Sequence, residues 1–237
     1  MKAYADLHLA PSLDDVANAR SMATLLAELH TALIGLAVPP QRLTPTPPIV
    51  EAFKSAGIDV AKRLNLKPRS REELLRSLRR FRSRYEIVAV DCGITPVSRV
   101  AVRDRRVDIV YFPKHEHGTV FRGNLARNCR AALEFDISEL TSRLGFEGRL
   151  HRMKREIEIA AELSATVIGC TGASNSFELR SLRDIAAVLH LFGLPLTSAM
   201  RSVSEVPFDM VTRNRLRMGK TQLEDGVKLL RRPADRE

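Results

Sequence analysis

The spacing of apolar residues along this chain switches repeatedly between a period of two and a period of about 3.6. Between Lys2 and Leu9, apolar residues alternate with Tyr4, Asp6 and His8, which predicts a strand. Residues 12–29 then place their apolar side chains at helical spacing. Continued along the chain, this reading predicts seven strands, at residues 2–9, 31–38, 58–66, 86–91, 108–112, 131–137 and 166–170.

Helical patterns separate these strands. A strand starts roughly every 22 to 35 residues, which is the repeat of β/α units. Seven units favour a TIM-like barrel over an open sheet, because barrels have eight units over ~250 residues. No eighth strand is predicted, and a doubly wound sheet is the alternative. The predicted helices cover residues 12–29, 51–55, 70–84, 96–102, 119–129, 150–163, 182–192, 198–203 and 209–218.

The chain of 237 residues is interpreted as one barrel domain over residues 1–237, because 44% of its residues are hydrophobic. Residues 39–48 carry five prolines, so a stiff loop is predicted there. Residues 219–237 form a charged C-terminal tail. A strand follows Met1 almost at once, leaving no room for a signal peptide. No apolar run reaches the ~20 residues of a bilayer span.

The most informative stretch is residues 165–194. A strand rich in β-branched residues leads into the small residues 172–175, and an amphipathic helix follows. Ser181 and Asp184 are spaced as a capping box at the start of that helix. Gly193 is placed to end it. The stretch is therefore one complete β/α unit.

The residue order of this unit resembles the signature of the RNase P protein component 3 family. The resemblance spans most of the chain and is sharpest at residues 165–204. That family often has Pro at the first helical position, where this chain has Leu182. The matching segments are Leu179-Arg180-Ser181, Arg183-Asp184-Ile185 and Leu191-Phe192-Gly193-Leu194.

The resemblance implies a distorted TIM-like barrel of the polymerase-and-histidinol-phosphatase (PHP) type. It also implies a subunit of ribonuclease P, the ribonucleoprotein that trims the 5′ ends of precursor tRNA. The implied partners are RNase P RNA, precursor tRNA and other protein subunits, notably protein component 2. In such particles the RNA positions Mg²⁺ for hydrolysis. The chain itself is then expected to hold no metal or cofactor, to be inactive in isolation and to reside in the cytoplasm.

Charge supports a nucleic-acid partner independently of the resemblance. The net charge is +10, and a surface this basic binds polyanions. Aromatic residues are few and Trp is absent, so contact with RNA backbone and shape is favoured over base stacking. Four basic clusters stand out, within residues 62–84, 99–106, 122–130 and 213–220. A single such cluster is as often a solvated face.

Loops that follow barrel strands meet at one rim. Six cations lie in or beside such loops and are predicted to bind RNA. The rival interpretation makes Arg180 and Arg183 structural, through ion pairs with neighbouring acids such as Glu178 or Asp184. The predicted RNA-binding set is Lys67, Arg99, Lys114, Arg122, Arg180 and Arg183.

A metal-dependent phosphoesterase of the PHP type is the alternative function. Enzymes of that type read D-x-H-x-H on the first strand; here Asp6 and His8 are present, but Ala10 replaces the second histidine. Losing a ligand opens the coordination shell. An enzyme should bring several further ligands to this rim, and the candidates are Asp91, His115, His117 and Asp136. The alternative is a capping interpretation, in which these residues only cap the ends of strands.

Two weaker features are a small-residue turn and the three cysteines. The turn at residues 171–173 has backbone N–H groups that could receive a phosphate, or it is a tight turn that needs Gly172 for clearance. Cys92, Cys129 and Cys170 lack metal-ligand spacing, which indicates buried thiols in a reducing compartment. No histidine is spaced to activate Cys92.

Overall fold

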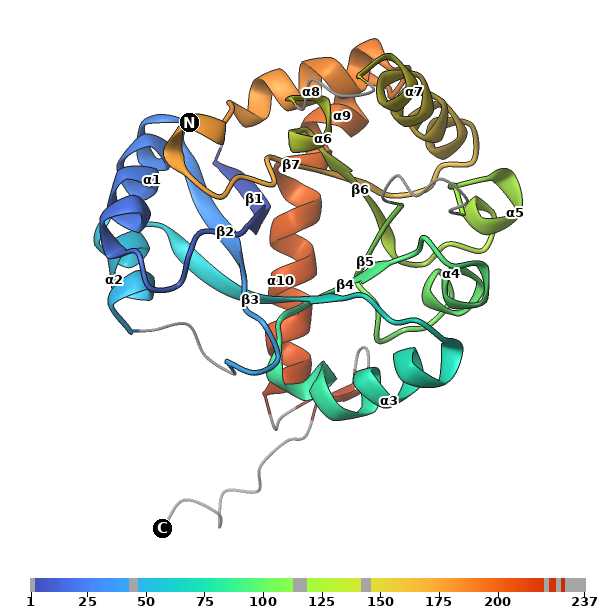
Figure 1. Cartoon of the computed structure of the whole chain (residues 1–237), viewed down its shortest axis with the longest axis horizontal. Coiled ribbons are helices and arrows are strands. Elements are labelled where there is room, and N and C mark those ends of the chain that lie inside the picture. Colours follow the sequence, from blue (N-terminus) through green and yellow to red (C-terminus); the bar gives the residue numbers. More distant parts are fainter. Residues whose placement is uncertain are drawn as a thin grey trace.

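Seven parallel strands lie side by side in chain order and curl into a nearly closed barrel (Figure 1). The computed structural model describes residues 3–42, 47–112, 119–141, 146–219, 222–224 and 227–228. All seven predicted strands are present with ends shifted by a few residues, and the doubly wound alternative is wrong because the strand order follows the sequence. The strands are β1 (Tyr4–Leu9), β2 (Thr31–Ala37), β3 (Asp59–Leu66), β4 (Ile87–Asp91), β5 (Ile109–Tyr111), β6 (Ala132–Asp136) and β7 (Val167–Cys170).

Helices cover the outside of the barrel (Figure 1). Leu, Val and Phe side chains on the outer faces of the strands pack against the apolar stripes of these helices and form the larger core. The helices are α1 (Val16–Glu28), α2 (Pro47–Ser55), α3 (Arg71–Phe81), α4 (Thr95–Ala101), α5 (Gly123–Ala126), α6 (Ser138–Thr141), α7 (Phe146–Glu162), α8 (Leu182–Leu191), α9 (Leu196–Ser202) and α10 (Glu205–Met218). Two 3₁₀ turns, Arg82–Arg84 and Ser176–Glu178, complete the set.

Three local predictions need correction. The end of the proline-rich stretch opens α2 at Pro47, since Pro is tolerated in the first turn of a helix. Ser181 is the N-cap of α8, as its position suggested, but its side chain makes no capping hydrogen bond. In the charged tail the structure describes a small antiparallel pair, β8 (Gln222–Glu224) and β9 (Val227–Lys228).

The barrel interior is filled in layers, because alternate residues of each strand point inward. At one end the filling is apolar: Ala61 of β3 and Ala132 of β6 join Leu7, Ile109 and other buried side chains. Two and four residues further along the same strands, the inward positions become polar. The period-two pattern therefore sets a charged layer above an apolar one.

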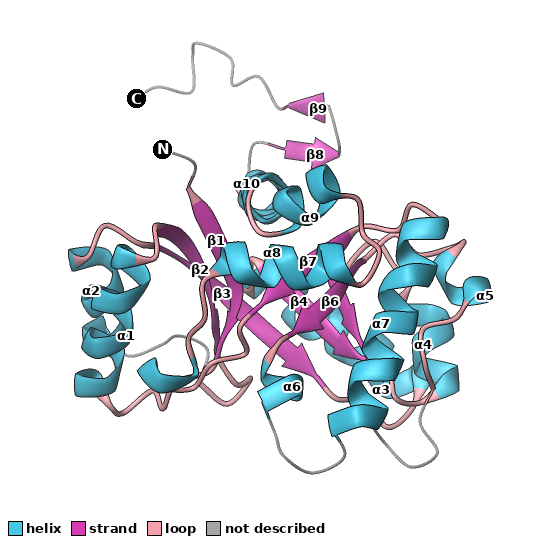
Figure 2. Cartoon of the chain, turned by 90° about the horizontal axis from the view of Figure 1, so that it is seen from above, coloured by secondary structure: helices cyan, strands magenta, loops and turns pink. Residues whose placement is uncertain are grey.

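Helix α10 covers the apolar end of the barrel. It crosses the barrel axis in Figure 1 and lies over the end where β1 begins in Figure 2. Its Met210 and Val211 complete the interior core. Asn214 is fully buried and donates to the backbone oxygen of Glu86 and to Oδ1 of Asp108, each at 2.8 Å. The polar layer is consequently left at the opposite end, where the βα loops lie.

The gap between β1 and β7 is bridged without a strand ladder. The N–H of Ala10 donates to the carbonyl of Ala173 at 2.9 Å, and the N–H of Ala5 donates to the carbonyl of Val203 at 3.0 Å. These bonds satisfy edge donors that would otherwise be exposed or orphaned. They explain how seven strands suffice where a complete barrel has eight.

Candidate functional site

His8 lies in the polar layer, between three strands. Its Nδ1 lies 2.9 Å from Oε1 of Glu134 and 3.5 Å from Oδ2 of Asp136, both on β6. Asn65 of β3 approaches the second ring nitrogen, with its Nδ2 3.3 Å from Nε2 of His8. Because Nδ1 faces two carboxylates, it carries a hydrogen rather than a lone pair. The imidazole therefore serves as a donor inside the barrel.

Arg63 supplies the second cation of this layer. The residue is 0% exposed. Its Nη1 donates to the carbonyl of Leu7 at 2.9 Å and lies 2.5 Å from Oε2 of Glu134, while its Nε donates to Oδ1 of Asn65 at 2.7 Å. An irregularity in the pairing of β1 with β2 falls between Asp6 and Leu9. The Leu7 carbonyl there faces the guanidinium.

The pKa values of Glu134 and His8 are shifted because these buried groups and Arg63 carry opposite charges. Burial acts to raise the pKa of Glu134, but the charges of Arg63 and His8 and their hydrogen bonds outweigh it and lower the pKa to about 2. Burial and Arg63 act to lower the pKa of His8, but Glu134 and Asp136 prevail and raise it to about 9. The charged forms hold one another in place. We refer to Arg63, His8, Glu134 and Asp136 as the barrel ion cluster.

One atom each from His8, Glu134 and Asp136 lies within 4.8 Å of the others, close enough to share a metal ion. The surrounding chemistry does not fit a divalent cation. Nδ1 of His8 carries a hydrogen, and Glu134 is already paired with the buried Arg63 guanidinium. A second buried cation would meet that guanidinium at close range, where like charges repel strongly. The barrel ion cluster therefore has a buried guanidinium beside the carboxylate that a metal would need.

The isolated chain should therefore not gain stability from divalent cations. We expect no shift in melting temperature on addition of Mg²⁺, Mn²⁺ or Zn²⁺ at about 100 µM, a concentration at which a site of micromolar affinity would add nearly 3 kcal/mol. Differential scanning fluorimetry on the chain and on the His8→Ala variant measures this. A shift of several degrees that disappears in the variant would contradict our interpretation.

The remaining polar residues near β1 and the strand ends have structural partners. Asp6 is fully buried and accepts from the hydroxyl of Thr171 at 2.5 Å, across the gap between β1 and β7; burial raises the pKa of Asp6 to about 6 despite these bonds. Asp91 and Asp136 accept from the backbone N–H groups of Gly93 and Ser138, each at 2.9 Å. The capping interpretation therefore fits Asp91, whereas Asp136 both caps its strand end and faces Nδ1 of His8 at 3.5 Å. His115 and His117 lie outside the described residues.

Two of the three backbone N–H groups in the turn at residues 171–173 are already used within the protein. The Thr171 N–H donates to the Asp6 carboxylate and the Ala173 N–H to the Thr171 hydroxyl, each at 3.3 Å. Gly172 has φ +65°, and a Cβ there would overlap the Asp136 carboxylate. The clearance interpretation of this glycine is therefore the right one, since an anion would meet two carboxylates here.

Five of the six predicted RNA-binding residues lie in described segments, and all five are exposed. Lys67 directly follows β3, and Arg122 is the N-cap of α5 in the connection after β5. Arg180 and Arg183 follow β7, whereas Arg99 lies in the last turn of α4, away from the β4 end. Lys114 lies outside the described residues. Topology thus gathers four of these cations at the rim beside the barrel ion cluster.

The rival interpretation of the rim residues holds in part for Arg180, whose charge is among the influences that lower the pKa of Glu178, after the hydrogen bonds from Ser174. Nη1 of Arg180 donates to the backbone carbonyls of Phe177 and Leu179 at 2.8 and 2.7 Å, so this side chain braces its own loop. For Arg183, no ion pair with Asp184 or Glu178 is found among the described contacts. Lys67, Arg122 and Arg183 are the best candidates for contact with an external anion.

The four basic clusters of the sequence separate into different roles. Arg63, counted with the first cluster, belongs to the barrel interior. Arg215 of the fourth holds Asp59 at 2.5 and 3.0 Å and Glu86 at 3.1 Å, which fastens α10 to the barrel. Arg106 of the second makes a bidentate pair with Asp104. These arginines are already paired with carboxylates of the protein itself.

Comparison with known proteins shows the family to which this barrel belongs. A sequence model of the family described as "RNase P subunit p30" matches residues 3–219. The chain belongs to the RNase P subunit p30 family. Ribonuclease P protein component 3 from Methanosarcina acetivorans is 26% identical over 205 residues, which cover 83% of each chain. The protein of the same name from Methanosarcina mazei is 25% identical over 92% of each chain.

Solved structures agree with the family at the level of the fold. A chain in the cryo-EM structure of archaeal ribonuclease P with mature tRNA superposes with a TM-score of 0.77 and 20% identity, covering 96% of this chain and 99% of that one. A histidinol phosphate phosphatase from Lactococcus lactis, solved with zinc, L-histidinol and phosphate, reaches a TM-score of 0.52 and 11% identity. It covers 81% of this chain and 94% of the phosphatase. The fold of this chain is therefore also the fold of a phosphatase that was solved with zinc.

Sequence reasoning identified His8 and Asp136 but missed Arg63, Asn65 and Glu134. The missed signal is a charged residue at the centre of a predicted strand, in Asp59–Leu66 and again in Ala132–Asp136. A charge in such a strand is rarely left without a partner. Two such strands with opposite charges predict a pair across the barrel. Members of the p30 family can be searched for this pattern directly.

Proposed function

We infer that the chain acts as a protein subunit of ribonuclease P, binding the catalytic RNA and supporting 5′-end maturation of precursor tRNA. The observation that carries this inference is the family match over residues 3–219. The barrel ion cluster supports it, because the buried guanidinium of Arg63 beside Glu134 disfavours a metal there, which would leave hydrolysis to another component. In this proposal the RNA holds the Mg²⁺ that activates water, and the isolated chain does not cleave phosphodiesters.

The role of the chain is electrostatic. Two RNA segments repel one another through their phosphates, and cations placed between them reduce this repulsion. Lys67, Arg122 and Arg183 are exposed and lie at one rim. With such a rim in place, less Mg²⁺ is needed to hold catalytic RNA and substrate together. We further propose protein component 2 as a neighbouring subunit and the cytoplasm as the site of action, on the strength of the family.

Reconstitution tests the proposal. The chain is added to RNase P RNA of the same genome together with the other protein subunits, and precursor-tRNA cleavage is measured over a range of Mg²⁺ concentrations. Omitting the chain should lower cleavage most strongly at low Mg²⁺. The triple variant Lys67→Ala, Arg122→Ala, Arg183→Ala should lower it about 10-fold there, and less when Mg²⁺ is abundant, because the added ions replace the lost charge.

A matched control variant has the same net charge as the rim variant. The triple variant Arg42→Ala, Arg155→Ala, Arg201→Ala also lowers the net charge from +10 to +7. Each of those arginines is exposed and already paired, with Asp14, Glu158 and Glu205 respectively. Cleavage should stay near wild type, since exposed ion pairs contribute little. Equal loss in both variants would mean that the rim has no special role, and full activity without the chain would refute the function.

A further inference from the structure

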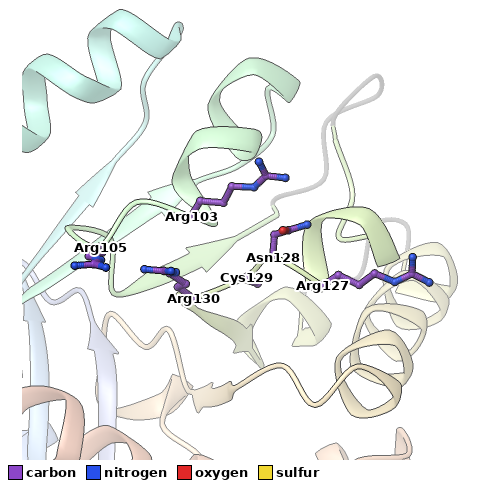
Figure 3. Close-up of a pocket in the computed structure, with 6 residues that line it drawn as sticks. All are labelled: Arg103, Arg105, Arg127, Asn128, Cys129 and Arg130. Atoms are coloured by element: carbon purple, nitrogen blue, oxygen red, sulfur yellow. The ribbon is translucent and has the colours of Figure 1, made fainter.

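A second basic surface lies at the opposite end of the barrel from the predicted rim. Four arginines, Asn128 and Cys129 line a pocket of about 550 Å³ (Figure 3). Arg103 and Arg105 lie between α4 and β5, and Arg127 and Arg130 lie between α5 and β6. Both loops precede their strands, and β5 pairs with β6, so the loops are neighbours. We name this group the arginine pocket.

The arginine pocket is preformed by its backbone. The N–H of Arg130 donates to the carbonyl of Val102 at 2.7 Å, which ties the two loops together. The Arg103 N–H donates to Val100 at 3.1 Å and the Cys129 N–H to Ala126 at 3.0 Å, which closes each loop on the helix before it. A ligand would not have to order these segments, so little conformational entropy is lost on binding.

The four guanidinium groups are exposed, and no ion pair holds any of them within the described residues. The nearest acid along the chain, Asp104, is occupied by Arg106 in a bidentate pair at 2.6 and 2.9 Å. In Figure 3 the guanidinium group of Arg130 extends toward Arg105, whereas those of Arg103 and Arg127 extend away from this pair. Like charges converging without a carboxylate repel, and an anion between them removes that cost.

The side chains of the pocket favour the phosphates of a nucleic-acid backbone as its ligand. Arginine forks donate two parallel hydrogen bonds to one phosphate, and none of the six lining residues is aromatic, so bases gain no stacking surface. Cys129 does not make the pocket a thiol phosphatase, because burial raises its pKa to about 11 and its thiol donates to the Ala131 carbonyl at 3.1 Å. A protonated thiol is no nucleophile at neutral pH.

We propose that the arginine pocket binds backbone phosphates of the RNase P RNA, so that the barrel contacts RNA at both ends. This inference rests on the proposed function and adds a second site to it. Such a chain bridges two RNA segments rather than coating one. The bridge fixes the distance between those segments at the length of the barrel.

Filter binding with labelled RNase P RNA of the same genome tests the pocket at several salt concentrations. The quadruple variant of Arg103, Arg105, Arg127 and Arg130 to Gln should bind at least about 20-fold more weakly at 0.1 M salt, with a salt slope less steep by about 1.5 to 3.5, which corresponds to two to four lost phosphate contacts. The matched control changes Arg20, Arg42, Arg155 and Arg201 to Gln, four exposed residues outside the pocket; both variants have a net charge of +6. The control should lose no more than about threefold.

A second quadruple variant, with Lys at the same four positions, covers the case in which the Gln variant does not fold. It keeps the charge and loses the fork, so it should retain the salt slope while binding about 3- to 10-fold more weakly. If wild-type chain fails to bind the RNA, the proposed function itself falls, and the pocket with it. If wild type binds and the pocket variants bind equally well, only the pocket inference is overturned. Loss of a protein subunit from the particle with unchanged RNA affinity would also overturn it, by assigning the pocket to a protein partner.

Discussion

Replacing Arg63 by Met is expected to lower the free energy of unfolding by about 3–5 kcal/mol, which is the cost of removing one partner from a buried ion pair. Arg63 is 0% exposed and lies 2.5 Å from a buried oxygen of Glu134. The substitution removes the charge but keeps an apolar side chain of similar length, so packing is largely kept. The loss should appear in urea unfolding followed by circular dichroism.

The double variant Arg63→Met, Glu134→Gln separates lost charge from lost packing. Neutralising both partners removes the orphaned carboxylate, so the double variant should be more stable than Arg63→Met alone. An exposed pair provides the control: Arg201→Met, which removes the partner of Glu205 at 2.9 Å, should cost less than about 1 kcal/mol. If Arg63→Met behaves like the surface control, the barrel ion cluster is not a stabilising network.

The pH dependence of this difference supplies an independent check. The pKa of Glu134 in the folded chain is lowered from 4.5 to about 2. A lowered carboxyl pKa stabilises the fold above the unfolded value, and this contribution is lost as the pH falls toward the folded value. The gap in stability between wild type and Arg63→Met should therefore be full above about pH 4.5 and narrow toward pH 2. A gap that stays constant with pH would point to packing instead.

The hydrophobic pattern predicted the barrel because each strand and helix shows its period locally. The helical stripe of Leu74, Leu78 and Phe81 is buried as the pattern requires. In β1, by contrast, Tyr4 and Asp6 are buried as well as the apolar positions between them, because the barrel covers both faces of the strand. What the pattern could not supply is the pairing of residues distant in the sequence. Lys62 and Arg63 are adjacent and equally basic, yet a one-residue step in a strand puts them on opposite faces. Only the pairing of strands tells which of the two meets Glu134.

The same limit explains which cations were assigned to RNA. The arginines of α10 were grouped as a basic cluster, but Arg215 lies against Asp59 and Glu86, acids from two other segments. The arginines of residues 103–130 were divided between two clusters by the intervening β5, and the fold brings them to one pocket. Counting charge along the sequence measures the potential of the whole chain. It does not show which charges are already neutralised.

The architecture suggests how a metal-enzyme fold can serve a ribonucleoprotein. The rim of such a barrel brings polar residues together. Here the cations beside Glu134 are the side chains of Arg63 and His8. An internal guanidinium keeps Glu134 charged without any metal, so the rim can be stable in the isolated chain at any Mg²⁺ concentration. The surface charges that remain unpaired are then left to interact with RNA. We therefore expect stability and RNA binding to depend on different arginines, so that each can be altered without the other.

Gly172→Ala is expected to destabilise the chain by about 2–4 kcal/mol, because two costs combine. The left-handed backbone at φ +65° is disfavoured for Ala by about 1–2 kcal/mol. The new methyl group would also overlap the Asp136 carboxylate, which accepts from the Ser138 N–H at 2.9 Å and lies 3.5 Å from Nδ1 of His8. Moving Asp136 away breaks both contacts. Urea unfolding gives the total cost.

Gly57→Ala isolates the backbone part of that cost. Gly57 has φ +76°, yet a Cβ there would meet no atom within 4 Å, so this variant should lose only about 1–2 kcal/mol. The excess loss in Gly172→Ala then measures the collision with Asp136. Adding Asp136→Ala to Gly172→Ala should cost less than the two single changes summed, because the collision is gone. Equal losses for Gly57→Ala and Gly172→Ala would show instead that Asp136 moves aside freely, and that the turn after β7 does not hold the barrel ion cluster in place.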